Sequence, residues 1–557
     1  MKKVILLFLF VPIWLSAGVI CVDNNNKLST QNGSSKYPYH EIQNAVLNAT
    51  NFDTIKVAVG TYNSIDNLGK PLFIMGGYAG ADSSTYTSGK SGDFNTRIID
   101  PSLTIISGGK DSIGIILTRF DFNTFNFLID NLTVKNNRRG IVCDVLVSWP
   151  HADYVTISNC IIENNGEQGK LSGGGIFVAG NHHRILNNEI RNNHGGRGAG
   201  ISGNSTMDSI IITGNRIEKN IGYDDHAGGV YLGGYAEISH NIISGNKVEN
   251  SYGWGGGVLI LGTAYMSFNI IKDNYCPSYG GAVFVDEGGI CYMEHELIYH
   301  NSTSLYGAGV ALDNGAPGSS YVYLTNCTIV NNYSPTANGG NAVFVDVESF
   351  CEVKNCILSG NKDDFFKTDG SSLKVTYTLS EESYSGIGNI IAEPMFADTS
   401  HENFYLQSTT GRYDPITQMW IKDINHSLAI DAGDPSSAYN LEPSPSGNRI
   451  NLGCYGNTIY ASKSKPTSID EILHQESKVT IYPNPIDGFF VVELNQQVRE
   501  PVTVSLYSPI GQKIKEWKLT CSEIRATFDV RELLNGFYFL SVKGKGWTQM
   551  EKLIKNE

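Results

Sequence analysis

Four six-residue stretches decide the fold: NEIRNN at 188–193, NRIEKN at 215–220, NIISGN at 241–246 and NIIKDN at 269–274. In each stretch an aliphatic residue is followed three positions later by Asn, and this spacing recurs nine times between residues 131 and 361. The nine pairs are Val134/Asn137, Ile162/Asn165, Ile190/Asn193, Ile217/Asn220, Ile243/Asn246, Ile271/Asn274, Ile298/Asn301, Ile329/Asn332 and Leu358/Asn361. Successive Asn residues of these pairs lie 26 to 31 positions apart, so the segment is a tandem repeat. Each unit is too small to bury its own apolar side and depends on its neighbours.

A second Asn precedes the aliphatic residue in eight of the nine copies: Asn131, Asn159, Asn188, Asn215, Asn241, Asn269, Asn326 and Asn355. Asn suits the corners of such a repeat because it tolerates left-handed backbone, and because stacked side-chain amides can hydrogen-bond from unit to unit. Gly-rich runs, such as those at 173–175, 255–257 and 280–281, occupy the other half of most repeats. Gly meets the same backbone need, or allows neighbouring units to approach closely.

The segments between these positions are short, β-branched and bounded by Gly or Asn, as in IIIT at 210–213, VYL at 230–232 and VFV at 283–285. None is long enough for a surface helix, which argues against a helical solenoid. About 27 residues with two or three strands predict one coil of a right-handed parallel β-helix, in which coils hydrogen-bond to one another about 4.8 Å apart. We therefore predict an all-β chain built around this solenoid.

Composition agrees with a turn-rich β protein, because the 557 residues include 60 Gly and only 17% charged residues. The net charge of −14 disfavours nucleic acid and anionic membrane surfaces as partners. Among the ten cysteines, Cys160, Cys327 and Cys356 each directly follow a repeat Asn, which predicts small apolar residues stacked in the wall. Cys327 and Cys356 lie on adjacent coils, where a disulfide is the alternative.

Residues 1–18 carry two lysines, an apolar run and a small-residue end, which predicts a secretory signal peptide. The apolar run is too short to span a bilayer, so we expect no transmembrane segment after its removal. Residues 39–49 have apolar positions at helical spacing, suited to covering the end of a solenoid, and a strand then ends in Gly-Thr-Tyr at 60–62. This beginning resembles that of secreted bacterial right-handed β-helix proteins. We assign 19–130 to the cap and first coils.

After the regular coils of 131–361, residues 362–460 contain closing coils and a module with LAIDAGDP at 428–435 and GNRINLGCYG at 447–456. The order and spacing resemble the terminal module of bacterial extracellular β-helix proteins. Asp431, Asp434 and Glu442 are candidate calcium ligands in this module. The alternative is that they cap backbone N–H groups in turns. Calcium is the one cofactor that the sequence suggests.

Residues 461–477 are polar and rich in Ser and Lys, which predicts a linker. Residues 478–557 alternate like strands of a small β-sandwich, with KVTIYPNP at 478–485 and LNGFY at 534–538. This segment resembles the C-terminal sorting domain of the Bacteroidetes type IX secretion system. The resemblance implies passage through the type IX machinery to the outer-membrane surface or the extracellular space. In that family the domain is often removed, while the cargo is attached to surface lipopolysaccharide or released.

Outward residues of a β-helix form columns along the axis, so candidate sites are read across repeats. Aligning the Gly-rich segments gives one column of Arg197, His226, Trp254, Tyr279 and Tyr306. Beyond the following strand, Asp286, Asp313 and Asp346 form a second column. Flat apolar rings beside carboxylates are what a groove for a sugar chain needs, so we predict a carbohydrate-binding face here. The alternative is that the rings only cover a strand edge and the acids are solvated.

Stacked carboxylates would repel if both were ionised, so they must diverge, share a proton or hold a cation. Two further candidates are the runs Tyr223-Asp224-Asp225-His226 and His182-His183-Arg184, for which a loop and a solvated corner are the alternatives. The motif sets of polygalacturonase, pectate lyase and mannuronan epimerase β-helix enzymes are incomplete or missing. Fold alone does not decide function. We therefore expect a secreted, monomeric, carbohydrate-binding or adhesin-like protein, with a polysaccharide lyase or glycoside hydrolase as the alternative.

Overall fold

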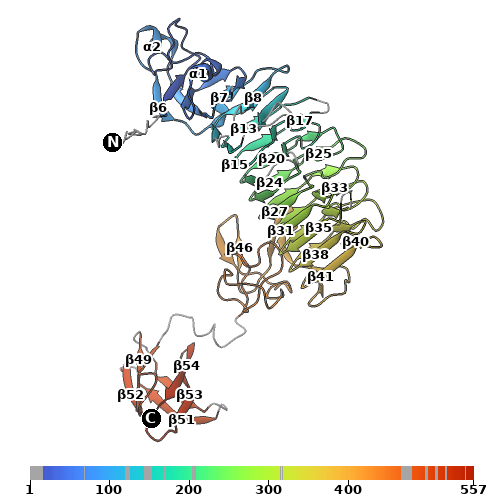
Figure 1. Ribbon diagram of the computed structural model, residues 1–557. Helices are drawn as coiled ribbons and strands as arrows, with labels where there is room; N and C mark the ends of the chain where they lie inside the picture. The colour runs from blue at the N-terminus through green and yellow to red at the C-terminus, as the bar shows by residue number, and fades with distance from the viewer. Residues whose placement is uncertain are drawn as a thin grey trace, which may run out of the picture. The chain divides into compact units, whose positions relative to one another are not determined.

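The computed structural model describes residues 17–556 except 68, 119–125, 144–152, 168–170, 204–208, 314, 316–317, 466–478, 496–499, 509–511, 521–522 and 546. The predicted signal peptide therefore lies outside the described residues up to position 16, and most of the predicted linker lies outside them too. The main body is a solenoid of short parallel strands arranged in three long sheets (Figure 1). This is the predicted β-helix.

Sheet A contains β1 (Val19–Val22), β2 (Thr54–Ala58), β5 (Phe73–Gly80), β9 (Phe127–Asp130), β12 (Val155–Ser158), β15 (His183–Leu186), β19 (Ile210–Thr213), β23 (Ala236–Ser239), β27 (Thr263–Ser267), β31 (Ile290–Glu294), β35 (Tyr321–Thr325), β38 (Phe350–Lys354) and β41 (Ser372–Thr376), with β6 (Asp93–Arg97) antiparallel to β5. Sheet B contains β3 (Gly60–Tyr62), β7 (Thr104–Ile106), β10 (Thr133–Lys135), β13 (Ile161–Glu163), β16 (Glu189–Arg191), β20 (Arg216–Glu218), β24 (Ile242–Ser244), β28 (Ile270–Lys272), β32 (Leu297–Tyr299), β36 (Thr328–Val330), β39 (Ile357–Ser359), β42 (Leu379–Ser380) and β43 (Ile390–Ile391).

Sheet C contains β4 (Ile65–Asp66), β8 (Ile113–Leu117), β11 (Arg139–Cys143), β14 (Ile176–Val178), β18 (Ile201–Gly203), β22 (Val230–Leu232), β26 (Val258–Ile260), β30 (Val283–Val285), β34 (Val310–Leu312), β37 (Val343–Val345) and β40 (Phe365–Lys367). A short sheet D between sheets B and C contains β17 (His194–Gly195), β21 (Ile221–Gly222), β25 (Lys247–Val248), β29 (Tyr275–Cys276) and β33 (Ser302–Thr303). Each regular coil therefore contributes one strand in turn to sheets A, B and C, and five coils add a strand to sheet D.

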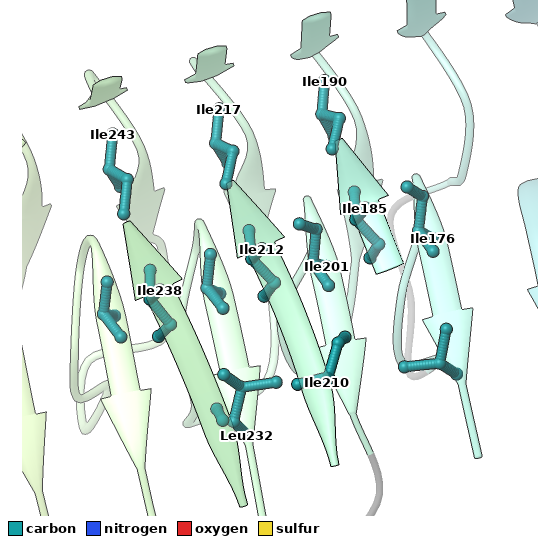
Figure 2. Close-up of a cluster of buried hydrophobic side chains, with 14 of the residues drawn as sticks. Ile176, Ile185, Ile190, Ile201, Ile210, Ile212, Ile217, Leu232, Ile238 and Ile243 are labelled. Atoms are coloured by element: carbon teal, nitrogen blue, oxygen red, sulfur yellow. The ribbon is translucent and has the colours of Figure 1, made fainter. Parts of the chain in front are cut away.

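The aliphatic repeat residues form a single buried column inside sheet B. Their register partners run in order along the strands, and each is at most 1% exposed: Ile162, Ile190, Ile217, Ile243, Ile271, Ile298, Ile329 and Leu358. Figure 2 shows Ile190, Ile217 and Ile243 in successive coils, with the sheet A isoleucines beside them. Because each side chain packs against a near-identical neighbour above and below, the core is one continuous apolar stack.

The asparagine that follows each aliphatic residue forms a buried ladder parallel to this stack. Asn220 is typical: its backbone N–H and its Nδ2 both donate to Oδ1 of Asn246, at 3.0 and 2.9 Å. The same Nδ2 also donates to the carbonyl of Ile190 in the previous coil, at 2.9 Å. The pattern repeats from Asn137 to Asn361, so the predicted coil-to-coil amide hydrogen bonds are confirmed.

The left-handed corner residue and the ladder residue are different residues. Positive φ falls on the position just before the ladder asparagine, as at Asn192 (53°), Lys219 (55°) and Asp273 (56°), whereas the ladder residues have none. Left-handed backbone therefore does not explain the recurring Asn of this column, whereas the amide hydrogen bonds do. At the corner between sheets A and B, in contrast, Asn159, Asn326 and Asn355 are themselves left-handed, and His240, Phe268 and His295 occupy the same position in other coils.

A second amide ladder at the corner between sheets A and B ends on an acid. Asn188, Asn215, Asn241 and Asn269 are linked through their amides, and Asn269 Nδ2 donates to Oε1 of Glu296 at 2.9 Å. Glu296 is fully buried, and its Oε2 has no hydrogen-bond partner. Burial raises the pKa of this carboxyl well above its ordinary value. Glu296 therefore occupies an amide position as a neutral acid.

The described cysteines are all buried and carry free thiols. Cys160, Cys327 and Cys356 occupy the second ladder position, as the alignment predicts, because each directly precedes its sheet B strand in register. The backbone N–H of Cys327 donates to Sγ of Cys356 at 3.3 Å, so the two residues are in contact across adjacent coils without a disulfide.

The start of the solenoid is covered by α1 (Ile42–Asn48), which buries Ile42, Ala45 and Val46 in the common core (Figure 1). This confirms the predicted capping helix, with tighter bounds. A second short helix, α2 (Ser83–Thr87), and two 3-10 turns, η1 (Pro101–Leu103) and η2 (Thr399–His401), complete the helical content of the described chain.

The chain divides into two compact units. The first comprises the solenoid up to Phe396 with segments 427–437 and 451–456, and the second comprises 397–426, 438–450 and 457–557. The two inserted segments pack along the solenoid corner: Asn326 Nδ2 donates to the Asn451 carbonyl at 3.1 Å, and Gly453 N–H donates to the Asn355 carbonyl at 2.8 Å. These parts of the terminal module therefore close the side of the last coils.

The second unit contains β45 (Asn403–Leu406), β46 (Arg412–Asp414) and β47 (Met419–Ile421), and β44 (Phe396–Asp398) crosses the boundary into it. Its C-terminal part has β48 (Val479–Tyr482), β49 (Phe489–Leu494) and β52 (Arg525–Asp529) in one sheet, and β50 (Val502–Tyr507), β51 (Lys513–Leu519), β53 (Gly536–Gly544) and β54 (Trp547–Lys555) in another. Both sheets contribute to one buried core, including Phe490, Val504 and Leu540. This is the predicted β-sandwich.

Replacing Ile217 by Ala should lower the free energy of unfolding by about 2–4 kcal/mol, because the cavity cannot be filled by its fixed neighbours. Replacement by Asp should cost more. Chemical denaturation of the purified protein measures both. The control is Arg216→Ala on the same strand, where an exposed side chain should change stability by no more than about 0.5 kcal/mol. Equal effects at the two positions would show that Ile217 is not packed in the core.

Replacing Glu296 by Gln should stabilise the protein at neutral pH by about 1–3 kcal/mol, because the amide still accepts from Asn269 Nδ2 and, unlike the buried acid, needs no proton that the unfolded chain would lose. Because its pKa is raised, Glu296 keeps its proton in the native protein at pH values above about 4.3, where the unfolded chain has lost it. The free energy of unfolding of the wild-type protein therefore falls as the pH rises from about 4.3 to the native pKa of Glu296. Denaturation across a pH series should show this loss in wild type and not in Glu296→Gln. The exposed Glu294→Gln serves as control, and an unchanged pH profile in Glu296→Gln would contradict the assignment.

Candidate functional site

The outer side of sheet C carries a second apolar cluster, separate from the core. The middle residues of its strands are register partners in successive coils and point away from the core: Tyr231, Leu259, Phe284, Ala311, Phe344 and Phe366. Leu259, Phe284 and Phe344 are buried, although they lie outside the solenoid wall. Other side chains must therefore cover them.

The covering side chains come from the predicted aromatic column. His226 pairs with Trp254, and Tyr279 pairs with Tyr306, through isolated parallel bridges between adjacent coils. Gly255 N–H donates to the Tyr279 carbonyl at 2.9 Å, which links the two pairs into one column. The ring centroids of Tyr279 and Tyr306 lie 5.5 Å apart.

Trp254, Tyr279 and Tyr306 are half-buried and pack on the apolar cluster. The Trp254 and Tyr279 centroids lie 6.0 and 5.8 Å from that of Phe284. The Tyr306 ring stacks on Phe344 at 4.7 Å. The rings thus cover a strand, which agrees with the alternative that they have a structural role. Part of each ring surface is still exposed to solvent.

The carboxylate column borders the same strip. Asp286, Asp313 and Asp346 directly follow β30, β34 and β37, and the backbone N–H of each donates to the carbonyl of the last residue of the sheet C strand in the preceding coil. Asp286 is buried, and its Oδ1 accepts from the N–H groups of Glu287 and Gly315 at 2.7 and 2.8 Å. Asp313 and Asp346 are more exposed.

The two columns meet at Tyr279. Burial, followed by the negative charges of Asp346 and Asp313, raises the pKa of its hydroxyl to about 12. The hydroxyl therefore stays protonated at neutral pH and lies in the field of both carboxylates. The ring column and the carboxylate column therefore border the same sheet C strands from opposite ends.

The earlier end of the column has a different character. Arg197 Nε lies 3.6 Å from Oδ2 of Asp224, and its guanidinium also approaches the Tyr231 hydroxyl. His226 is largely buried, its Nδ1 lies 2.6 Å from Oδ1 of Asp225, and its ring stands edge-on to Trp254.

Two pKa shifts mark this end. Burial opposes ionisation of Asp225, but the charge of His226 and its hydrogen bond hold the pKa of Asp225 below the ordinary value. Burial raises the pKa of Tyr231 despite the nearby Arg197. The Asp224-Asp225-His226 run is therefore more than a solvated loop, because it is tied to the candidate face.

The other sequence candidates lie elsewhere. His182 has left-handed backbone beside β15 in sheet A, where its Nδ1 lies 2.9 Å from Ser209 Oγ, and His183 is buried. Asp434 pairs with Lys354 at 2.5 Å and caps Ser436, which lowers its pKa to about 2. These partners fit the turn-capping interpretation of Asp434.

The other two calcium candidates, Asp431 and Glu442, belong to different units of the chain. Asp431 lies in the first unit and Glu442 in the second, where Glu442 Oε1 accepts from Asn457 N–H at 2.9 Å. Within the described residues, no three His, Cys, Asp or Glu side chains are grouped to hold a metal ion. A calcium site therefore stays a prediction.

Sequence reasoning missed Tyr231, Phe284 and Phe344, which form the floor under the ring column. The sequence could have predicted their outward orientation, because side chains alternate along a strand. Each is the middle residue of a three-residue strand whose first and last residues point into the core. It also missed the stacked tyrosines Tyr265, Tyr292 and Tyr323 on the outside of sheet A, with centroids 4.8 and 4.9 Å apart. Those rings cover one another's faces, so they offer mainly edges to a ligand.

Two family comparisons match the two parts of the chain. The family described as "Right handed beta helix region" matches residues 199–380, and the family described as "Secretion system C-terminal sorting domain" matches residues 480–556. The chain is a right-handed β-helix protein with a type IX sorting domain. The expected resemblances to right-handed β-helix proteins and to the type IX sorting domain are confirmed, whereas the resemblance of residues 362–460 to a terminal module stays a prediction. The sorting domain marks the β-helix protein for export to the cell surface or the extracellular space.

No curated protein matches the β-helix protein. Among solved structures, the crystal structure of pectate lyase Pel9A is similar at a TM-score of 0.40 and 15% sequence identity, covering 79% of this chain and 96% of that one. In the described part of the chain, no helix has the length and apolarity needed to cross a membrane.

Proposed function

We propose that the β-helix protein binds carbohydrate at the cell surface, in an adhesin-like role, through the outer face of sheet C between β26 and β37. The observation that carries this proposal is the column of half-buried rings over the apolar strip, with Tyr279 and Tyr306 5.5 Å apart and with Asp286, Asp313 and Asp346 at the other end of the same strands. Partly exposed rings supply apolar contact for pyranose faces, and carboxylates accept hydrogen bonds from sugar hydroxyls. The spacing supports it too, because a 5.5 Å step between rings is close to the length of one sugar unit in an extended chain.

The rigidity of the β-helix favours such a role. Each ring is attached to a coil whose backbone is hydrogen-bonded above and below, so the face is organised before a ligand arrives. Export by the type IX route places this face where polysaccharides are found. An extended glycan would lie along the solenoid axis and contact several coils at once.

Replacing Tyr306 by Ala should weaken glycan binding by about 1–2 kcal/mol through lost stacking area. It should also lower stability moderately, because the ring stacks on buried Phe344. Tyr306→Phe keeps the packing and should retain most of the affinity. A screen of neutral, acidic and amino polysaccharides by affinity electrophoresis, followed by calorimetry, measures both variants. The control Tyr265→Ala removes a ring from sheet A and should leave binding unchanged; equal losses for Tyr265→Ala and Tyr306→Ala would contradict the placement.

A second candidate function is cleavage of the bound chain by a lyase or hydrolase. The observation that favours it is the group at the earlier end of the column, where Asp225 orients His226 and Arg197 approaches the Tyr231 hydroxyl. Such groups can move protons and hold anions next to a substrate. The half-buried Trp254 ring joins this group to the proposed binding strip.

If this second function holds, the purified protein should release unsaturated or reducing ends from a polysaccharide that it binds. His226→Gln should reduce that release by at least about 100-fold, because general acid–base groups contribute factors of this size, while binding is retained. The control is His182→Gln, since His182 lies in sheet A outside the face. Binding without release by the wild-type protein would leave the β-helix protein a non-catalytic binder.

A further inference from the structure

We propose that a cavity at the start of the solenoid binds a neutral sugar unit through hydrogen bonds to its hydroxyl groups. The cavity has a volume of about 440 Å³, within the range of about 300–1,000 Å³ that is usual for small-molecule sites. It lies beside β4 and β8, and β4 is six strands before β26 in the order of sheet C. This site is therefore separate from the ring column and does not depend on binding there.

The walls of the cavity come from separate segments that the fold holds in place. Gln43 of α1 contributes one wall, and its side-chain amide exchanges hydrogen bonds with the backbone of Asp66, at 2.8 and 3.1 Å. The loop before β8 contributes Asp111 and Ser112, and the backbone N–H of Arg138 donates to the Ser112 carbonyl at 2.8 Å. The cavity is therefore organised before a ligand binds, which lowers the entropy cost of binding.

The asparagine ladder begins beside this cavity. Asn137 is the first ladder residue, and its Oδ1 accepts from the backbone N–H of Gly108 at 2.7 Å. Gly108 packs so closely that an added Cβ would lie 2.8 Å from Ser64 Cβ and 3.0 Å from Ser112 Cβ. The ladder that fixes the coils therefore also fixes the loop at 108–112 that borders the cavity.

The lining carries polar groups that are available to a ligand. Within the described part of the chain, four of its side chains have no hydrogen-bond or ion-pair partner: the hydroxyls of Ser64 and Ser112, the carboxylate of Asp111 and the guanidinium of Arg138. Ile113 and Ile116 add apolar surface to the same lining. A few polar groups around an apolar surface are the usual composition of a small-molecule site.

This mixture of groups suits hydroxyls better than it suits a charged ligand. A sugar hydroxyl both donates and accepts, so hydroxyls can donate to Asp111 and accept from Arg138. A uronic acid would bring its carboxylate near Asp66 and Asp111, and an amino sugar would bring its ammonium near Arg138. The cavity therefore favours a neutral sugar unit, with the apolar side of the ring toward Ile113 and Ile116.

The test uses the purified protein and monosaccharide probes. Saturation-transfer NMR and titration calorimetry measure binding of the methyl glycosides of glucose, galactose and mannose, and of the uronic acid and 2-amino counterparts of each. At least one neutral glycoside should bind, about tenfold or more tightly than its charged counterparts. Tighter binding of a charged sugar than of every neutral glycoside, or no binding of any probe, overturns the inference.

Substitutions in the lining test the placement of the site. Arg138→Ala and Asp111→Ala should each weaken binding of that glycoside by about tenfold or more, because each removes a charge-assisted hydrogen bond. Gly108→Ala should weaken it as well, by displacing Ser64 and Ser112. The matched control is Arg184→Ala, which removes an exposed arginine from sheet A and should leave binding unchanged. Thermal melting checks that each variant is folded, and binding that survives both Arg138→Ala and Asp111→Ala overturns the inference.

Tyr306→Ala separates this site from the ring column. The variant should bind the monosaccharide as the wild-type protein does, because Tyr306 lies beside β34, far along sheet C from β4. Loss of monosaccharide binding in Tyr306→Ala, with retention in Arg138→Ala, overturns the inference and assigns the binding to the rings. Monosaccharide binding that depends on Arg138, in a protein that retains no polysaccharide, supports the cavity and contradicts the proposed function.

Discussion

The buried asparagine ladder is the constraint on which the rest of the structure depends. Each ladder amide donates to the next coil and to the previous one, so every polar group in this corner of the wall is satisfied only when the coils are in register. A shift of one residue would leave these amides unpaired and move the isoleucine stack out of the core. The ladder therefore fixes the register of the coils, because any other register would leave buried amides without hydrogen bonds. The apolar stack supplies most of the stability.

The fixed register of the coils also arranges the outward-facing side chains regularly. Because successive coils repeat the same geometry, one residue type at one alignment position becomes a column along the axis. Sheet A and sheet C both carry aromatic columns, but the stacked rings Tyr265, Tyr292 and Tyr323 cover one another, whereas Trp254, Tyr279 and Tyr306 lie over an apolar strip beside carboxylates. Carboxylates border both columns, since Glu237 and Glu352 are the register partners of Tyr265 and Tyr323, so the difference lies in the buried apolar strip beneath the sheet C rings.

Spacing in the sequence was enough to predict the coils, the ladder and the columns, because a period of about 27 residues converts alignment directly into position. It was not enough for features that depend on side-chain direction. The contact of His226 with Asp225 and the floor of Phe284 and Phe344 follow from rotamers and loop paths inside a repeat. Glu296 was also invisible to the pattern, because an acid in an amide ladder breaks the motif that reveals the ladder.

The central claim is that the register-locked outer face of sheet C is where a glycan binds. A crystal structure of the protein with the oligosaccharide that it binds most tightly tests it most directly. We predict sugar rings against Tyr279 and Tyr306, along the strip of sheet C that these side chains cover. An oligomer bound on the outside of sheet A, or on the sorting domain, while the sheet C face remains empty, would contradict it.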